Sequence, residues 1–369
     1  MERDWRAVRQ RCDRFLSSKR PESARALLTE VAESLPDDEL PDRYGEGGAV
    51  TALEERVAAL LGHQAAVVMP TGTMAQQAAV RVWCDRRGLP AIAFHPTSHL
   101  ELHEERAYAH LHGLRAALVG DAGRPLRFED LDALAEPVAA LVLELPQREL
   151  GGVLPEWSEL VAQTEWARAR GVALHLDGAR LWECGPYYGR PYDEVARLFG
   201  TVYVSFYKGL GGLAGCALAG PADVVAEARL WQTRHGGKLF QLFPVAASAS
   251  LALDRMLPRM AELLAHARAV AAAVREVPGV EVVPDPPQTP LFHVHARLGD
   301  DRAVAAQAAL AVAEETGIWF GGIWGTDTFV QVGPGVQKLE LTIGEPALEV
   351  TPEETRALFA RLVERCAAF

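Results

Sequence analysis

Two short motifs could bring an acid and an amine together. One is HLDGAR at residues 175–180, which contains Asp177, and the other is YKGLGG at residues 207–212, which contains Lys208. Each follows an apolar run, so we expect two adjacent strands to deliver Asp177 and Lys208 to one edge of a sheet. Pyridoxal phosphate (PLP) chemistry needs such a pair, because a lysine forms the Schiff base and a buried carboxylate keeps the pyridine nitrogen protonated.

A third motif, PTGTMA at residues 70–75, lies between a predicted strand and a predicted helix. Gly72 permits close approach of the backbone, and the amides of Gly72 and Thr73, with the Thr73 hydroxyl, open a helix whose positive end favours a phosphate. Taken alone, this pattern is also typical of a turn with a helix N-cap. Its place ahead of the Asp177 and Lys208 motifs favours phosphate binding, because ligands of open α/β sheets gather at the carboxyl ends of strands.

Short apolar runs that alternate with helical patterns predict an α/β protein. The expected strands are residues 65–69, 90–94, 116–119, 139–145, 172–176, 201–206 and 216–219. The expected helices among them are residues 50–61, 73–84 and 156–170. This order predicts one mostly parallel seven-stranded sheet with helices on both faces.

The character of the chain changes after Pro221. Residues 222–234 and 246–277 are alanine-rich and predict helices, with a break at Pro244, and a proline-rich stretch leads into predicted strands at 291–296 and 338–343. We therefore expect three parts: an N-terminal helical segment at 1–43, a large α/β domain at 44–245 and a small α+β domain at 246–369.

Composition limits the classes of function. The 369 residues (40.0 kDa) are 49% hydrophobic and carry a net charge of −12, which disfavours a nucleic-acid partner because phosphate backbones are anionic. No apolar run is long enough for a membrane span and the N-terminal residues contain no apolar signal core, so we expect a cytoplasmic protein without a membrane partner. The five cysteines show no CxxC spacing and predict packed, reduced thiols.

The chain resembles the threonine aldolase and aromatic amino acid β-eliminating lyase family from about Tyr44 to Gly220. The resemblance is carried, in order, by YGEG at 44–47, AVVMPTGT at 66–73, Ser98-His99, Leu143-Glu144 with Gly151-Gly152, HLDGAR at 175–180 and KGLG at 208–211. It implies a fold-type-I PLP-dependent transferase-like fold with a smaller C-terminal α+β domain. It also implies a homodimer or homotetramer, because the family builds its PLP sites at a subunit interface.

Carried over residue by residue, the resemblance makes Lys208 the Schiff-base lysine and Asp177 the partner of the ring nitrogen. His99 would stack on the cofactor, Gly72 and Thr73 would hold the phosphate, and Arg180 would lie beside the ring near the substrate carboxylate. Two alternatives remain open at this point: Arg180 could form a structural salt bridge with Asp177, and Asp177 could cap the segment after its strand. Glu104 and Tyr207 are further candidates, Glu104 to orient His99 or exchange a proton and Tyr207 to handle a proton.

His95, His99 and His103 recur every four residues, the spacing that a helix would need for a zinc site. Pro96 interrupts this segment and no acidic or cysteine ligand set accompanies it, so we expect no metal. His293 and His295 alternate on a predicted strand and favour a structural, hydrogen-bonded role.

The chain departs from the family where the substrate carboxylate is bound. The segments at 16–21 and 145–149 lack the family's usual sequences, and Glu340 stands where an arginine normally completes the carboxylate site. Because an anion cannot replace that arginine, we expect another cation to take over or the substrate to bind differently. The candidate cations are Arg148, Arg180, Arg234 and Lys338.

The expected activity is that of a PLP-dependent carbon–carbon lyase acting on an amino acid or related amine. Lys208, His99, Asp177 and Arg180 would form its catalytic set, and the reaction would be aldol-type Cα–Cβ cleavage or β-elimination. Aminotransfer or another fold-type-I reaction is the alternative, because the same core supports all of them. A PLP-binding scaffold without turnover is a further alternative.

Overall fold

The computed structural model describes residues 4–321 and 328–367 and divides the chain into two compact units. One unit consists of Ala24–Glu149 and Leu154–Pro258, and the other of Met1–Ser23, Leu150–Val153 and Arg259–Phe369. We call them the large and the small unit. In the part of the chain that the model describes, no helix has the length and apolar character needed to cross a membrane.

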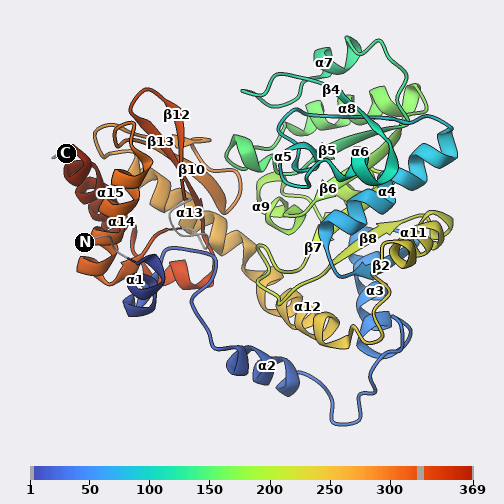
Figure 1. The fold of residues 1–369 in the computed structure, drawn as a ribbon, viewed down its shortest axis with the longest axis horizontal. Coiled ribbons are helices and arrows are strands. Elements are labelled where there is room, and N and C mark those ends of the chain that lie inside the picture. The colour runs from blue at the N-terminus through green and yellow to red at the C-terminus, as the bar shows by residue number, and fades with distance from the viewer. Residues whose placement is uncertain (1–3, 322–327, 368–369) are drawn as a thin grey trace. The chain divides into compact units, whose positions relative to one another are not determined.

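The large unit is built around a seven-stranded sheet, as the sequence predicts (Figure 1). Its strands in spatial order are β2 (Ala65–Met69), β8 (Cys216–Gly220), β7 (Thr201–Ser205), β6 (Ala173–Gly178), β5 (Ala140–Glu144), β3 (Ala91–Phe94) and β4 (Arg115–Leu118). Only the β8 pairings are antiparallel, and the other four neighbouring pairs are parallel. Six of these strands are short and almost fully buried, so they appear in the sequence as continuous apolar runs, whereas the edge strand β4 is partly exposed.

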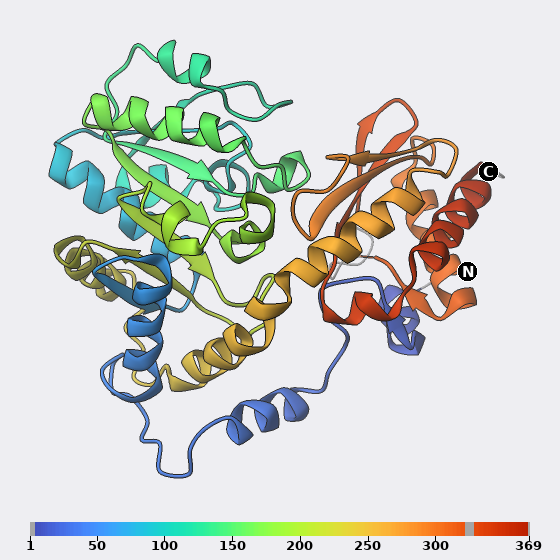
Figure 2. The same ribbon diagram turned by 180° about the vertical axis from the view of Figure 1, so that it is seen from behind.

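Helices of the large unit cover both faces of the sheet (Figures 1 and 2). Ala75, Ala78 and Ala79 of α4 pack with Val225 and Ala228 of α11 in one buried cluster against β2, β7 and β8, and α8 lies on the opposite face. The small alanine side chains allow these helices to approach the sheet closely. The helices are α2 (Ala24–Glu33), α3 (Gly48–Leu61), α4 (Gly72–Arg87), α5 (His99–Leu102), α6 (Ala107–His112), α7 (Phe128–Asp132), α8 (Trp157–Ala169), α9 (Gly185–Tyr188), α10 (Tyr192–Ala196), α11 (Ala222–Arg234) and α12 (Phe243–Met256).

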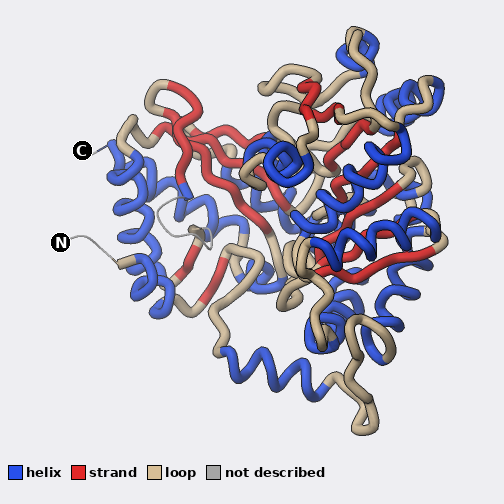
Figure 3. Tube along the Cα trace, turned by 45° about the vertical axis from the view of Figure 1, so that its right-hand side comes forward, coloured by secondary structure: helices blue, strands red, loops and turns tan. Residues whose placement is uncertain are grey.

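The small unit contains a four-stranded antiparallel sheet with helices (Figure 3). The sheet has the order β12 (Phe329–Gly333), β13 (Val336–Thr342), β10 (Leu291–Arg297) and β9 (Val280–Val283). A separate parallel pair joins β1 (Arg14–Phe15) to β11 (Ile318–Trp319). The helices are α1 (Trp5–Arg11), α13 (Met260–Val274), α14 (Arg302–Thr316) and α15 (Pro352–Ala367).

The predicted helix at 246–277 is wrong as a single element. The chain forms α12, a 3₁₀ turn at Leu257–Arg259 and then α13. Pro258 explains the interruption, because proline has no N–H to donate within a helix and its ring clashes with the preceding turn. Pro244 lies in the first turn of α12, where a missing N–H costs little.

Candidate active site

The carboxyl ends of β2, β3, β5, β6 and β7 meet at one edge of the large sheet, and the candidate residues lie there. Asp177 near the end of β6 is opposite Glu144 of β5 on one side and Tyr203 of β7 on the other. Lys208 follows β7, which ends at Ser205. The sheet therefore brings the predicted acid and amine to adjacent strand ends, where open α/β sheets bind ligands.

Lys208 is held in an environment that favours its uncharged amine. Burial lowers the pKa of Lys208, and the nearby cations of Arg180 and Arg148 lower it further. The carboxylates of Asp177 and Glu144 act in the opposite direction. A lysine with a depressed pKa is the form that can attack a carbonyl carbon near neutral pH.

Asp177 is buried and its carboxylate accepts two hydrogen bonds. The Ala179 amide donates to Oδ1 at 3.1 Å, and Gln76 Nε2 of α4 donates to Oδ2 at 2.5 Å. An ionised carboxylate has about four acceptor positions, so each oxygen can still accept another donor. Arg180 forms an ion pair with Glu183 at 3.0 Å, and the alternative of a salt bridge between Arg180 and Asp177 stays a hypothesis.

The start of α4 has the geometry that the PTGTMA motif predicts. Thr71 is the N-cap, and its hydroxyl accepts from the Met74 amide at 3.3 Å. Gly72 and Thr73 therefore form the first turn, where backbone amides point away from the helix. A Cβ added at Gly72 would lie 2.1 Å from the Tyr203 hydroxyl oxygen, so this close approach requires glycine.

Replacing Gly72 with alanine should disturb the start of α4. Since the new methyl group would overlap the buried Tyr203 ring, we expect the free energy of unfolding to fall by about 1–3 kcal/mol and PLP binding to weaken. Urea unfolding and PLP titration would measure the two effects. Gly333→Ala is the matched control, because a Cβ there would meet open space. Equal stability and PLP affinity in the two variants would contradict the prediction.

His99 and Glu104 form a second functional pair beside the first. His99 Nδ1 lies 3.0 Å from Glu104 Oε1, and Gln77 Nε2 donates to Glu104 Oε2 at 2.8 Å. The Glu104 side chain is 1% exposed whereas that of His99 is 30% exposed, so the buried acid orients a partly accessible imidazole. Glu104 is thus no solvated surface charge, and its predicted contact with His99 is present.

Glu104→Gln tests this arrangement. The amide cannot supply the negative charge that fixes His99 through its Nδ1 atom, and a hydrogen bond to a charged group contributes about 1.5–3 kcal/mol. We expect kcat to fall by roughly tenfold to a hundredfold with a smaller change in KM. Glu105→Gln, which alters the exposed neighbouring carboxylate, should keep the parent kinetics. Steady-state kinetics of both variants would measure this, and equal kcat values would refute the orienting role.

Glu144 is a third carboxyl group at this edge. Burial, and then the neighbouring Asp177 charge, raise the pKa of Glu144 to about 8, so it holds a proton at neutral pH. The Arg148 amide donates to Glu144 Oε1 at 3.2 Å. The neighbouring Asp177 thus adds to the effect of burial in favouring a protonated Glu144.

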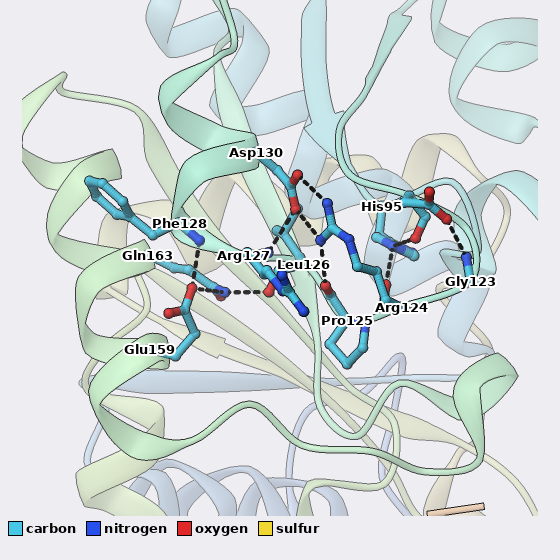
Figure 4. Close-up of polar contacts among 11 residues, drawn as sticks. His95, Gly123, Arg124, Pro125, Leu126, Arg127, Phe128, Asp130, Glu159 and Gln163 are labelled. Atoms are coloured by element: carbon cyan, nitrogen blue, oxygen red, sulfur yellow. Dashed lines mark hydrogen bonds and ion pairs between the residues drawn. The ribbon is translucent and has the colours of Figure 1, made fainter.

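A pocket adjoins Glu144 and is walled by the segment at 121–128 (Figure 4). Arg124 pairs with Asp130 through two hydrogen bonds of 2.7 and 2.6 Å, and Gln163 Nε2 donates to the Leu126 carbonyl at 2.8 Å. These contacts hold the segment over the sheet edge. The residues lining the pocket are His95, Pro125, Leu126, Val142, Leu143, Glu144, Leu145, Gln147, Pro155 and Gln163.

The histidines at four-residue spacing have separate partners. His95 is buried, with Nδ1 2.8 Å from the Thr97 hydroxyl and Nε2 2.9 Å from the Asp121 carbonyl, so it anchors the loop of Figure 4. His103 Nε2 lies 2.9 Å from Glu149 Oε1. Within residues 4–321 and 328–367, no group of three or more His, Cys, Asp or Glu side chains has metal-binding geometry.

The remaining predicted residues divide between the two units. Tyr207 adjoins Lys208 and is partly exposed, and burial raises its phenol pKa. Arg148 and Arg180 affect the charge of Lys208, whereas Arg234 lies over the Trp231 ring at 4.4 Å. Glu340 belongs to β13 of the small unit, where it lies 3.8 Å from His293 Nε2. Of the candidate cations in the large unit, Arg148 and Arg180 are therefore the two that act on the charge of Lys208.

Sequence reasoning missed several polar residues of this site. Gln76 and Gln77 are consecutive in α4, and both are almost fully buried. The sequence did offer a signal for these two residues: they are adjacent glutamines in an alanine-rich helix that begins at the PTGTMA motif. Because glutamine is seldom buried without polar partners, such a pair indicates polar groups nearby. Glu144 was noticed only as part of the family resemblance, and its protonated state depends on the register with Asp177.

The chemistry of these groups suits PLP. The buried amine of Lys208, with its depressed pKa, suits the aldehyde of PLP, and the buried Asp177 carboxylate, with acceptor positions to spare, suits the ring nitrogen. The start of α4 suits the phosphate, and the accessible imidazole of His99 suits the face of the ring. When bound, PLP would supply an electron sink for a carbanion at the substrate Cα atom.

Solved structures with the same fold share much of this sequence. A putative L-allo-threonine aldolase from Listeria monocytogenes matches with a TM-score of 0.90 and 37% identity, covering 98% of each chain. A putative aromatic amino acid β-eliminating lyase/threonine aldolase from Exiguobacterium sp. 255-15 matches with a TM-score of 0.90 and 38% identity, over 98% of this chain and 99% of that one.

Sequence relatives point the same way. The low specificity L-threonine aldolase of Escherichia coli (strain K12) is 28% identical over 288 residues, 76% of this chain and 83% of that protein. Aldolase vrtJ of Penicillium aethiopicum is 32% identical over 246 residues, which is 62% of this chain and 59% of the length of that protein. The family model described as β-eliminating lyase matches residues 23–297.

The seven-stranded sheet and the matching solved structures together show that the chain has the fold of the fold-type-I PLP-dependent enzymes, as the sequence predicts. Within that class, the chain belongs to the β-eliminating lyase family. Its threonine aldolase relatives are carbon–carbon lyases that act on amino acids.

Proposed function

We propose that this protein binds PLP and cleaves the Cα–Cβ bond of β-hydroxy-α-amino acids, leaving glycine and an aldehyde. One observation carries the proposal: Lys208, with a depressed pKa, and the buried Asp177 stand at adjacent strand ends beside the first turn of α4. The relatives named as L-threonine and L-allo-threonine aldolases support this substrate class.

In this proposal, each residue has one task. Lys208 would hold the cofactor covalently, Asp177 would pair with its ring nitrogen, and Gly72 and Thr73 would hold its phosphate. His99 would stack on the ring, and its Nε2 atom would accept the proton of the substrate β-hydroxyl group, while Glu104 holds the Nδ1 side of the imidazole at 3.0 Å. That proton transfer lets the Cα–Cβ bond break with formation of a carbonyl group on the leaving fragment.

The substrate carboxylate would bind a cation of the large unit. Arg180 is the better candidate, because its charge acts on Lys208, its side chain is 13% exposed and its ion pair with Glu183 fixes the guanidinium. Arg148 is the second cation near Lys208. Tyr207, next to Lys208, is available as a proton donor.

A panel of amino acids tests the function. The purified protein with added PLP would receive L- and D-forms of threonine and allo-threonine, serine and alanine, with separate assays for aldehyde, 2-oxo acid and amino-group transfer. Aldehyde release with stoichiometric glycine from a β-hydroxy amino acid is expected. Release of 2-oxo acid and ammonia would assign β-elimination, and amino transfer would assign an aminotransferase. PLP binding without any product would assign a scaffold.

We further propose that the chain forms a homodimer or homotetramer. Apolar side chains of the large unit are exposed at Tyr44, Leu213, Leu239 and Phe240, and the Tyr44 and Phe240 rings contact each other at a centroid distance of 5.4 Å. Covering such side chains would stabilise an assembly. Light scattering after size-exclusion chromatography would give the mass, and a monomer at micromolar concentration would contradict the proposal.

A cytoplasmic location completes the proposal. The five cysteines are free thiols, which suits a reducing compartment, and the acidic composition suits a small-molecule substrate without nucleic acid. Fractionation of the source cells with an antibody against the protein would test it.

A further inference from the structure

A chain of hydrogen bonds runs through the large unit and ends at Asp177. Trp83 Nε1 donates to Thr201 Oγ1 at 2.9 Å, and that oxygen lies 2.9 Å from His175 Nδ1. His175 Nε2 lies 2.8 Å from Gln76 Oε1, and Gln76 Nε2 donates to Asp177 at 2.5 Å. Gln76, His175 and Thr201 are fully buried, so they have these protein partners in place of bulk water.

When Asp177 is ionised, the chemistry of the members sets the direction of every bond in this chain of hydrogen bonds. An ionised Asp177 only accepts, so Gln76 must turn its NH₂ group to Asp177 and its oxygen to His175. Burial lowers the pKa of His175 to about 4, so the imidazole is neutral and has one N–H group, which the Gln76 oxygen places on Nε2. Nδ1 is then an acceptor for the Thr201 hydroxyl proton.

Trp83, at the end of the hydrogen-bond chain farthest from Asp177, disfavours the reverse direction of these bonds. The indole of Trp83 can only donate, so Thr201 Oγ1 always accepts one hydrogen bond. If Asp177 were protonated and the chain reversed, His175 Nδ1–H would also donate to Thr201, whose own buried hydroxyl proton would lose its acceptor. A buried hydroxyl without an acceptor costs about 1–3 kcal/mol. The arrangement therefore favours the state in which all protons point toward an anionic Asp177.

We propose that Trp83, Thr201, His175 and Gln76 are positioning residues, which hold Asp177 as an ionised acceptor for the ring nitrogen of the cofactor. The inference rests on the proposed function, because it assigns a task to residues that act through Asp177. It also gives α4 two tasks, since the helix that would receive the phosphate at Gly72 carries Gln76 one turn later.

Other titratable groups also affect the charge of Asp177, so these residues must stay unchanged in the variants that test the proposal. The titratable groups that interact with it are Glu144 of β5, His175 of β6, Tyr203 of β7, and Tyr207 and Lys208 after β7. The useful variants are therefore those that leave all five in place. Thr201→Val removes the hydroxyl group and keeps the shape, Thr201→Ser keeps the hydroxyl group, and Gln76→Leu removes the donor to Asp177.

The experiment has two readouts on the PLP-loaded protein. The first is the pH midpoint of the visible absorbance band of the Lys208–PLP linkage. A less firmly protonated ring nitrogen repels the imine proton less, so the midpoint should rise by roughly one to two pH units in Gln76→Leu and by about half a unit in Thr201→Val. Thr201→Ser should restore the parent midpoint.

The second readout is the ¹⁵N NMR spectrum of His175, assigned with a His175→Asn variant. The parent protein should carry the proton on Nε2 around neutral pH, and Thr201→Val should mix the two tautomers. A proton on Nδ1 in the parent, or parent midpoints in both Gln76→Leu and Thr201→Val, would overturn the proposal. Reduced stability with unchanged midpoints would likewise overturn it, because a purely structural role predicts that outcome.

The two proposals fail in different ways. If the parent protein takes up no PLP, the proposed function is wrong. The His175 tautomer in that protein then still decides whether the bonds point toward Asp177.

Discussion

Lys208→Ala is expected to abolish covalent PLP binding and to lower turnover on the order of 10⁴-fold or more. The reason is specific to this position, since Lys208 is the lysine buried beside Asp177 and Glu144 and its pKa is lowered by burial. Borohydride reduction of the PLP-loaded parent, followed by peptide mass spectrometry, should place the added mass on the peptide that contains residue 208. The same treatment of Lys208→Ala should add no mass.

The other lysines provide matched controls. They are Lys19, Lys238 and Lys338. Lys238 belongs to the large unit, and its side chain is 42% exposed with Glu46 3.9 Å away, so Lys238→Ala should leave both the labelling and the kinetics unchanged. Labelling of any of these three lysines in the parent protein, with residue 208 unlabelled, would remove the basis for the proposed site.

Asp177→Asn should lower kcat by roughly 10²–10³-fold, the usual effect of removing one preorganised electrostatic partner from a buried site. The substitution keeps the size of the side chain but replaces one of the two oxygens that accept from Ala179 and Gln76 with an NH₂ group, and it removes the charge that would hold a proton on the ring nitrogen. PLP should still bind through Lys208. A changed absorbance maximum with retained PLP stoichiometry, together with kinetics, would measure the effect.

Asp42→Asn is the matched control for a buried aspartate. Asp42 is 1% exposed and accepts from the amides of Leu242 and Phe243 at 2.8 Å each, so its carboxylate has backbone partners of its own. We expect it to change stability but to keep the absorbance of the bound cofactor. If Asp177→Asn had kinetics like those of Asp42→Asn, the assigned role of Asp177 would be refuted.

The arrangement of the large sheet could be predicted from sequence because its signals are local. Each strand is a short apolar run between turn residues, and buried strands of parallel sheets have this pattern on both faces. The prediction of one helix at 246–277 was wrong because the alanine-rich segments on both sides of Pro258 have high helix propensity, so the sequence pattern looks continuous across the proline. The domain boundaries near 43 and 245 remain predictions.

The sequence by itself determined which residues stand at strand ends, and so the pairing of Asp177 with Lys208 and the helix start at Gly72. The tertiary structure decided the states and partners of these groups. Burial, and then the neighbouring Asp177 that the register of β5 and β6 sets beside it, raise the pKa of Glu144. Gln76 reaches Asp177 from a helix about a hundred residues earlier in the chain. Protonation and hydrogen-bond direction depend on burial and on neighbours distant in sequence, which no local pattern of residues can encode.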